Sequence, residues 1–112
     1  MTIDVYSQYF SADLVFDGVP RHAAIVKLTS DSAAGQIRYT ASVSFFPHND
    51  EEDYAVSFDA YFEKELYSAA GRRSKKREAV LMEELPAVID ELAEDAGGVV
   101  LWDRPLREAR MG

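Results

Sequence analysis

A strict alternation of apolar and polar side chains between Gln36 and Phe46 constrains the fold of this chain more than any other feature of its sequence. Side chains of a β-strand point in turn to opposite faces of a sheet, so a period of two predicts a strand with one buried and one solvated face. The apolar positions, which we expect in the core, are Ile37, Tyr39, Ala41, Val43 and Phe45, and the polar positions are Gln36, Arg38, Thr40, Ser42 and Ser44.

The first sixteen residues also alternate, but the alternation changes phase. One set of alternate apolar residues stops at Tyr9, and the other begins at Phe10. A strand changes the face of its side chains in this way at a bulge, where one extra residue is inserted. We therefore predict a first strand with a bulge or bend at Tyr9 and Phe10.

The pair Asp17-Gly18 lies between two apolar stretches and predicts a tight hairpin turn. Pro20 cannot donate to a β-ladder, so the start of the second strand is expected at an edge or outside the sheet. We predict pairing mainly over residues 22–29 and interpret residues 30–35 as a loop.

A second alternation follows Pro47 and the acidic residues after it. Its apolar positions are Tyr54, Val56, Phe58, Ala60 and Phe62, and we expect this segment to form a long hairpin with residues 36–46. The spacing of Phe58, Phe62 and Leu66 suits a helix equally well, and residues 63–70 are mostly good helix formers. Residues 59–70 thus remain open between strand and helix, and we favour a strand as far as Phe62.

One long amphipathic helix is predicted after Ser74, which is a suitable N-cap residue, and it ends at Gly97-Gly98. Pro86 lies inside this pattern and should kink the helix. Residues 99–102 are a short apolar run that we expect to return to the sheet. The predicted buried face of the helix comprises Leu81, Leu85, Val88, Ile89, Leu92 and Ala96.

Strands followed by a helix are typical of an α+β fold. We predict an antiparallel meander sheet of about four to five strands with one long, Pro-kinked helix packed on one face. The chain has 112 residues, the usual size of one domain. We therefore expect a single domain over residues 1–112, in which residues 103–112 form a charged C-terminal tail.

The composition excludes several functional classes. Twenty acidic residues against twelve basic ones give a net charge of −8, which disfavours non-specific binding to nucleic acids or anionic membranes. The chain has no cysteine, which excludes disulfides, thiolate nucleophiles and Cys-ligated zinc.

No apolar run approaches the roughly 20 residues that a membrane helix requires, so we expect no membrane span. The first ten residues lack the basic start and continuous apolar stretch of a secretory signal. We expect a cytoplasmic protein.

The most unusual local feature is a basic cluster at the predicted start of the helix. It comprises five cations and the predicted N-cap residue: Arg72, Arg73, Ser74, Lys75, Lys76 and Arg77. Cations oppose the partial positive charge of a helix N-terminus, so something is expected to compensate them. A solvated charged turn is the commoner role of such a cluster. The functional alternative is an anion or partner-binding site built from guanidinium groups and exposed backbone N–H groups.

This cluster does not match a phosphate-binding loop, because the first glycine of G-x-x-x-x-G-K-[ST] and its spacing are missing. A nuclear-import signal is a further, unspecific interpretation.

An acidic loop, Asp50, Glu51, Glu52 and Asp53, provides the opposite charge. Calcium loops alternate their acidic ligands and need a glycine, whereas this run is contiguous and has no glycine, so we predict no metal site. A solvated hairpin tip is its simplest role, and binding to a basic partner is the functional alternative.

No catalytic constellation or cofactor motif is present in the sequence. His22 and His48 are the only histidines, and neither belongs to a known hydrolase or metalloprotease motif. Most aromatic residues occupy predicted core positions. Tyr61, Tyr67 and Trp102 are less certain, and such side chains are enriched in protein interfaces.

These observations favour a small non-enzymatic interaction or regulatory module without a cofactor. Its partner is another protein or a second copy, with the acidic loop of one copy meeting the basic cluster of the other in a homodimer. The alternative is a nucleic-acid-associated factor that contacts phosphate through residues 72–77. A third hypothesis is that the rows of carboxylates imitate a phosphate backbone, which the basic cluster argues against.

Overall fold

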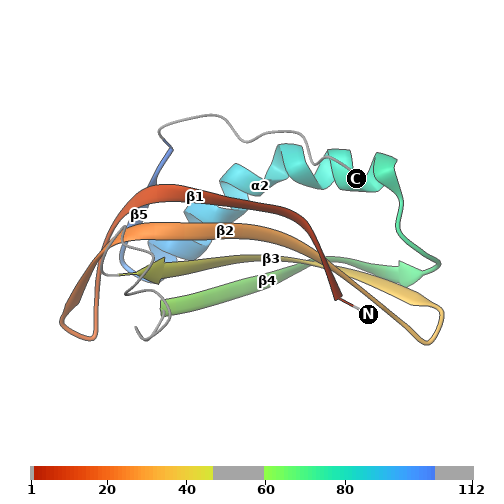
Figure 1. Ribbon diagram of the computed structural model, residues 1–112, viewed down its shortest axis with the longest axis horizontal. Helices are drawn as coiled ribbons and strands as arrows, with labels where there is room; N and C mark the ends of the chain where they lie inside the picture. Colours follow the sequence, from red (N-terminus) through yellow and green to blue (C-terminus); the bar gives the residue numbers. More distant parts are fainter. Residues whose placement is uncertain (1, 47–59, 103–112) are drawn as a thin grey trace.

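The computed structural model describes residues 2–46 and 60–102. Five strands pair antiparallel in it to form one sheet (Figure 1). The strand order is β4-β3-β2-β1-β5. The described elements follow the chain as β1 (Thr2–Phe16), β2 (Val19–Ala33), β3 (Gln36–Phe46), β4 (Ala60–Ala70), α2 (Lys75–Asp95) and β5 (Val99–Leu101). The α+β class and the antiparallel meander with one helix against it are thus confirmed.

Two tight turns set the register of the first three strands. Asp17 and Gly18 join β1 to β2 with φ values of 52° and 75°, and Ala34 and Gly35 join β2 to β3 with 54° and 76°. Turns with positive φ at both central residues match the twist of paired strands, so each strand returns directly along the previous one. The Asp17-Gly18 hairpin is confirmed, but the segment predicted as a loop over 30–35 is strand as far as Ala33.

The segment that the sequence left open between strand and helix is the edge strand β4. It pairs with β3 from Gln36↔Ala70 to Phe45↔Ala60, with an irregularity beside Tyr39 that accommodates one extra residue in β4. Pairing along the whole of β3 satisfies the backbone groups on one side of this strand, which outweighs the helix propensity of residues 63–70. The central residues of β4, Glu63, Lys64 and Glu65, are all exposed.

The change of phase in β1 occurs earlier than predicted. The register with β2 shifts between Asp4 and Tyr6, where Val5 and Tyr6 are both buried, and again between Ser11 and Leu14. No shift lies at Tyr9 and Phe10. The sequence prediction failed here because Tyr9, although aromatic, pairs with Ile25 on the face of the sheet opposite to Phe10.

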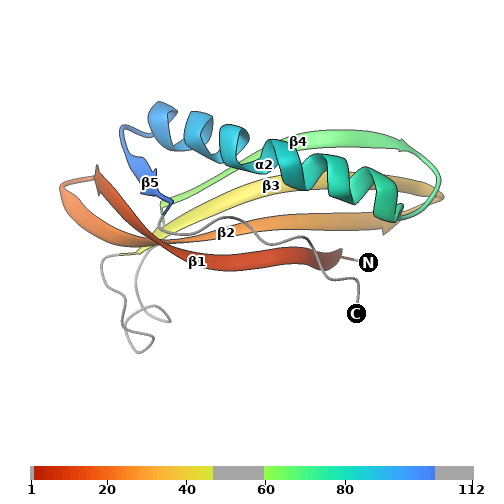
Figure 2. The same cartoon turned by 90° about the horizontal axis from the view of Figure 1, so that it is seen from above.

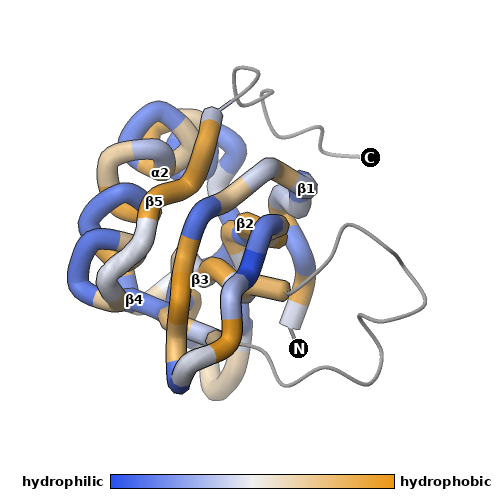
Figure 3. The backbone as a smooth tube through the Cα atoms, turned by 90° about the vertical axis from the view of Figure 1, so that its left-hand side faces the viewer, coloured by the Kyte–Doolittle hydropathy of each residue, from blue (hydrophilic) through white to orange (hydrophobic). Residues whose placement is uncertain are grey.

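The helix α2 lies on one face of the sheet, over β3 and β4, and the chain then crosses to β5 beside β1 (Figure 2). Hydrophobic β5 lies between α2 and β1 (Figure 3). The core forms between the sheet and the helix, and its largest fully buried apolar side chains are Tyr39, Phe10, Phe45, Leu14, Leu28, Leu85 and Ile89.

The alternation in β3 predicted this core correctly, because all five of its apolar residues are at most 3% exposed. On the opposite face, hereafter the outer face, Ser42 departs from the prediction and is only 4% exposed. Its direct neighbours across the strands are Lys27 and Glu63. A short side chain in the middle of a sheet is covered when both neighbours are long.

Both ends of α2 have the caps that the sequence predicts. The side chain of Ser74 accepts a hydrogen bond from the backbone N–H of Arg77 at 3.2 Å. At the other end, the N–H of Gly98 donates to the carbonyl of Ala93 at 2.8 Å, and Gly97 has a φ of 88°. This is a Schellman motif, which requires positive φ after the last helical residue.

The helix continues through Pro86, which lacks the N–H that would donate to the carbonyl of Met82. We expect Pro86→Ala to raise the free energy of unfolding by about 1–3 kcal/mol, since proline is about 3 kcal/mol less favourable than alanine in a helix interior. Urea denaturation measures this change. The neighbouring exposed substitution Ala87→Gly should lower stability by about 1 kcal/mol. A Pro86→Ala variant no more stable than the wild type would show that the helix is adapted to proline.

Candidate functional site

A buried carboxylate pairs with one of the cations at the start of α2. Glu78, in the first turns of the helix, is only 1% exposed. Arg73 binds it with two nitrogens, Nε to Oε2 at 2.9 Å and a terminal nitrogen to Oε1 at 3.2 Å. A guanidinium group that holds both carboxylate oxygens is a strong and geometrically specific partner.

The sheet provides a second partner for this carboxylate. The hydroxyl of Tyr39, on β3, donates to Oε2 of Glu78 at 2.6 Å. The same hydroxyl accepts a hydrogen bond from the backbone N–H of Ser74 at 3.2 Å. These contacts fix the first turn of the helix to β3 near the start of that strand, and the position of Glu78 near the N-terminus is favourable for the helix dipole.

The pKa shifts in this network follow from the contacts. The hydrogen bonds to Glu78 raise the pKa of Arg73, an effect that partial burial opposes. Burial raises the pKa of Tyr39 above its usual 10.0, and the hydrogen bond to Glu78 raises it further. Both groups therefore keep their protons at neutral pH, so Arg73 is a cation and Tyr39 is a neutral phenol.

The other cations of the basic cluster remain on the surface. Arg77 lies over the ring of Tyr67, 4.3 Å from its centroid, as in a cation–π contact. Arg72, Lys75 and Lys76 are exposed. Among the residues that the structure describes, no acid forms an ion pair with any of these four. We call Arg72, Lys75, Lys76 and Arg77 the cationic ridge.

The residues predicted as an anion or partner site thus take different roles. Arg73 is held by a buried carboxylate and Ser74 caps the helix, so both are already used inside the fold. The cationic ridge stays accessible, and its binding role remains a prediction. The acidic loop, Asp50 to Asp53, lies outside the described residues, as does the predicted tail over 103–112.

The rest of α2 carries the opposite charge. Beyond Glu78 its charged side chains are all acidic, namely Glu83, Glu84, Asp90, Glu91, Glu94 and Asp95, and its last turn has no basic residue. Acids near a helix C-terminus oppose the dipole, as do cations near its N-terminus. The exposed surface of this helix is therefore positive at the N-terminus and negative at the C-terminus, and both charges oppose the helix dipole.

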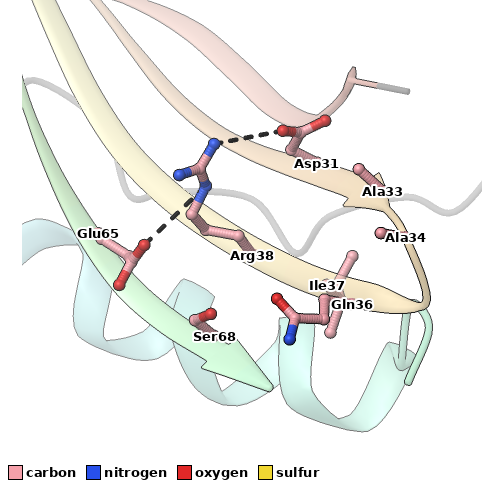
Figure 4. Close-up of a pocket in the computed structure, with 8 residues that line it drawn as sticks. All are labelled: Asp31, Ala33, Ala34, Gln36, Ile37, Arg38, Glu65 and Ser68. Atoms are coloured by element: carbon pink, nitrogen blue, oxygen red, sulfur yellow. Dashed lines mark hydrogen bonds and ion pairs between the residues drawn. The ribbon is translucent and has the colours of Figure 1, made fainter. Parts of the chain in front are cut away.

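A shallow pocket lies on the outer face, at the turn between β2 and β3 (Figure 4). Its volume is about 340 Å³, and Arg38 in its middle contacts Asp31 at 3.3 Å and Glu65 at 3.9 Å. Arg38 and Glu65 each remain 54% exposed, so these ion pairs are weak. The pocket offers no buried polar group that would fix a ligand.

The three aromatic residues of uncertain role do not gather on one surface. Trp102 packs edge-on against Phe10 at 4.7 Å and donates to Asp90 at 2.6 Å, and Tyr67 lies beneath Arg77. Only Tyr61 is largely exposed, on the outer face of β4. The three rings therefore do not form a shared exposed aromatic surface.

Within the described ranges, no group of three or more His, Asp or Glu residues is arranged to hold a metal ion. The same residues include no helix long and apolar enough to cross a membrane. No protein-family model matches the chain, and neither the curated proteins nor the solved structures include a significant match.

We expect Glu78→Ala to lower the free energy of unfolding by about 2–4 kcal/mol, because it leaves Arg73 partly buried without its counter-charge. Glu78→Gln should cost less, since the amide can still accept a bond from Tyr39. Lys75→Ala, in the same turn but exposed, should change stability by less than about 0.5 kcal/mol. Chemical denaturation compares the three, and equal effects of Glu78→Ala and Lys75→Ala would contradict the role of this network.

The raised pKa of Tyr39 predicts a loss of stability at high pH. A group that holds its proton more tightly when folded contributes its full stabilisation below its ordinary pKa of 10.0 and loses it as the pH rises through the folded value. We expect the unfolding free energy to decrease from about pH 10 upward. The Tyr39→Phe variant should show a smaller decrease in urea titrations, and an unchanged pH profile would contradict the prediction.

Proposed function

We propose that this protein is a non-enzymatic interaction module that binds an acidic protein surface through the cationic ridge. The observation that carries the proposal is that four cations are exposed at one end of α2 and have no acidic partner among the described residues. They persist in a chain of net charge −8, where many carboxylates are available as partners.

The anchoring of the ridge supports this role. The network of Arg73, Glu78 and Tyr39 fixes the first turn of α2 on the sheet, so the neighbouring side chains extend from a rigid base. A binding site on a rigid element loses less conformational entropy when it binds its partner. Stacking on Tyr67 restricts Arg77 in the same way.

An acidic protein surface fits this ridge better than a nucleic acid does. The remaining turns of the same helix carry only acidic charges, from Glu83 to Asp95. A long phosphate backbone laid along α2 would meet these carboxylates and be repelled. A partner with a localised group of carboxylates would contact the ridge alone.

A labelled oligo-glutamate peptide is a suitable probe of the ridge, measured by fluorescence anisotropy at low salt. The triple variant Arg72→Gln, Lys75→Gln, Lys76→Gln should weaken binding by about 3- to 150-fold, since each exposed charge contributes about 0.2–1 kcal/mol. The matched control Lys27→Gln, Arg38→Gln, Lys64→Gln removes three cations that already pair with acids, and it should bind as the wild type does.

Equal binding by the triple variant and the control would refute the proposal. Single-stranded DNA and RNA of matched charge are measured alongside the peptide. Tighter binding of either nucleic acid, with a salt dependence that weakens in the triple variant, would instead support a nucleic-acid-associated function.

A further inference from the structure

The exposed side of α2 carries a line of residues with opposite charges at its two ends. The helix buries Glu78, Leu81, Met82, Leu85, Ile89 and Ala93 against the sheet. With 3.6 residues in each turn, the line opposite to this face contains Lys76, Val80, Glu83, Ala87 and Glu94, which we call the outer line of α2. Glu91 lies next to this line and is already paired with Lys64 of β4 at 3.6 Å.

The ends of the outer line are aligned on the helix surface. Lys76 and Glu94 are separated by eighteen residues, which is five complete turns and about 27 Å. Both side chains are exposed, and Val80, between them, is 44% exposed. The side of α2 away from the sheet is open in the described part of the chain (Figure 2).

We propose that the acidic surface bound by the cationic ridge is the C-terminal half of α2 in a second copy of this chain, so that two α2 helices pair antiparallel about a two-fold axis. This inference rests on the proposed function and names its partner. Lys76 then lies beside Glu94 of the partner subunit, and the symmetry repeats the same contact at the other end.

The helix dipoles support the antiparallel arrangement. Within one copy, cations at the N-terminus and acids at the C-terminus are both unfavourable. In an antiparallel pair, the cations of one helix lie at the negative end of the other helix, and the acids lie at its positive end. The cations and the acids each oppose the dipole of their own helix in the isolated chain. In the pair, each group lies at the end of the other helix whose dipole attracts it.

The middle of the outer line suits a close but reversible contact. Val80 and Ala87 are apolar and small, which allows two helices to approach. Glu83 lies between them, and the two copies of this carboxylate come near the axis and repel each other. We therefore expect a dimer that dissociates on dilution or with increasing salt, because its main contacts are exposed ion pairs.

Charge-exchanged variants test the pairing through sedimentation equilibrium and light scattering at low salt. The wild type should dimerise with increasing concentration. Lys76→Glu alone and Glu94→Lys alone each place like charges at both ends, and each should raise the dimer dissociation constant by about tenfold or more. An equimolar mixture of these two variants restores opposite charges at both ends, so it should form a heterodimer of wild-type affinity.

The control exchanges the same kinds of charge away from the ridge and the outer line. Lys27 lies on the outer face of β2, and Asp95 lies about 100° around the helix from Glu94. Lys27→Glu and Asp95→Lys should therefore weaken the dimer much less, and mixing them should restore little. Circular dichroism shows that each variant is folded.

A wild-type protein that stays monomeric at its highest soluble concentration in low salt would overturn the pairing. So would an equal effect of the control exchange, or a mixture that fails to restore the dimer. If such a monomer still binds the oligo-glutamate peptide through the ridge, the proposed function stands and only the choice of a second copy as partner fails.

Discussion

The arrangement of the helix on the sheet depends on one buried carboxylate. Glu78 is held by Arg73 and Tyr39, and Tyr39 also accepts a bond from the N–H of Ser74, so one small network joins the helix start, the preceding turn and β3. A charge buried to this extent is tolerable only when its partners satisfy it fully. The network therefore specifies where the helix begins and how it lies on the sheet, more than it adds to net stability.

This network also separates the basic cluster into two functions. Arg73 is used within the fold, whereas the cationic ridge remains on the surface. The bipolar charge of α2 is unfavourable for an isolated helix, and the packing of its buried face against the sheet compensates for it. The charges of the cationic ridge lower the stability of the helix and have no acidic partner among the described residues. Binding to another molecule would give them one, and both proposals made above rest on this reasoning.

Sequence patterns predicted the fold where one physical effect dominates. The alternation in β3, the Asp17-Gly18 turn and the caps of α2 each depend on local geometry or on burial of one face, and each is confirmed. The prediction was wrong or open where distant pairing decides, as in the bulges of β1 and the strand β4. Glu78 was missed because a lone acid in a helix resembles a solvated one. Its only signal was a position just after five cations.

The charged centre of β4 has a consequence for how this protein behaves at high concentration. An unpaired sheet edge is a template on which further chains can add as strands, and such growth leads to fibrils. Glu63, Lys64 and Glu65 occupy the middle of this edge and are all exposed. An incoming copy in the antiparallel register centred on Lys64 would set lysine against lysine and glutamate against glutamate. These side chains therefore oppose growth in this register, which matters because no element of residues 2–46 and 60–102 covers the outer edge of β4.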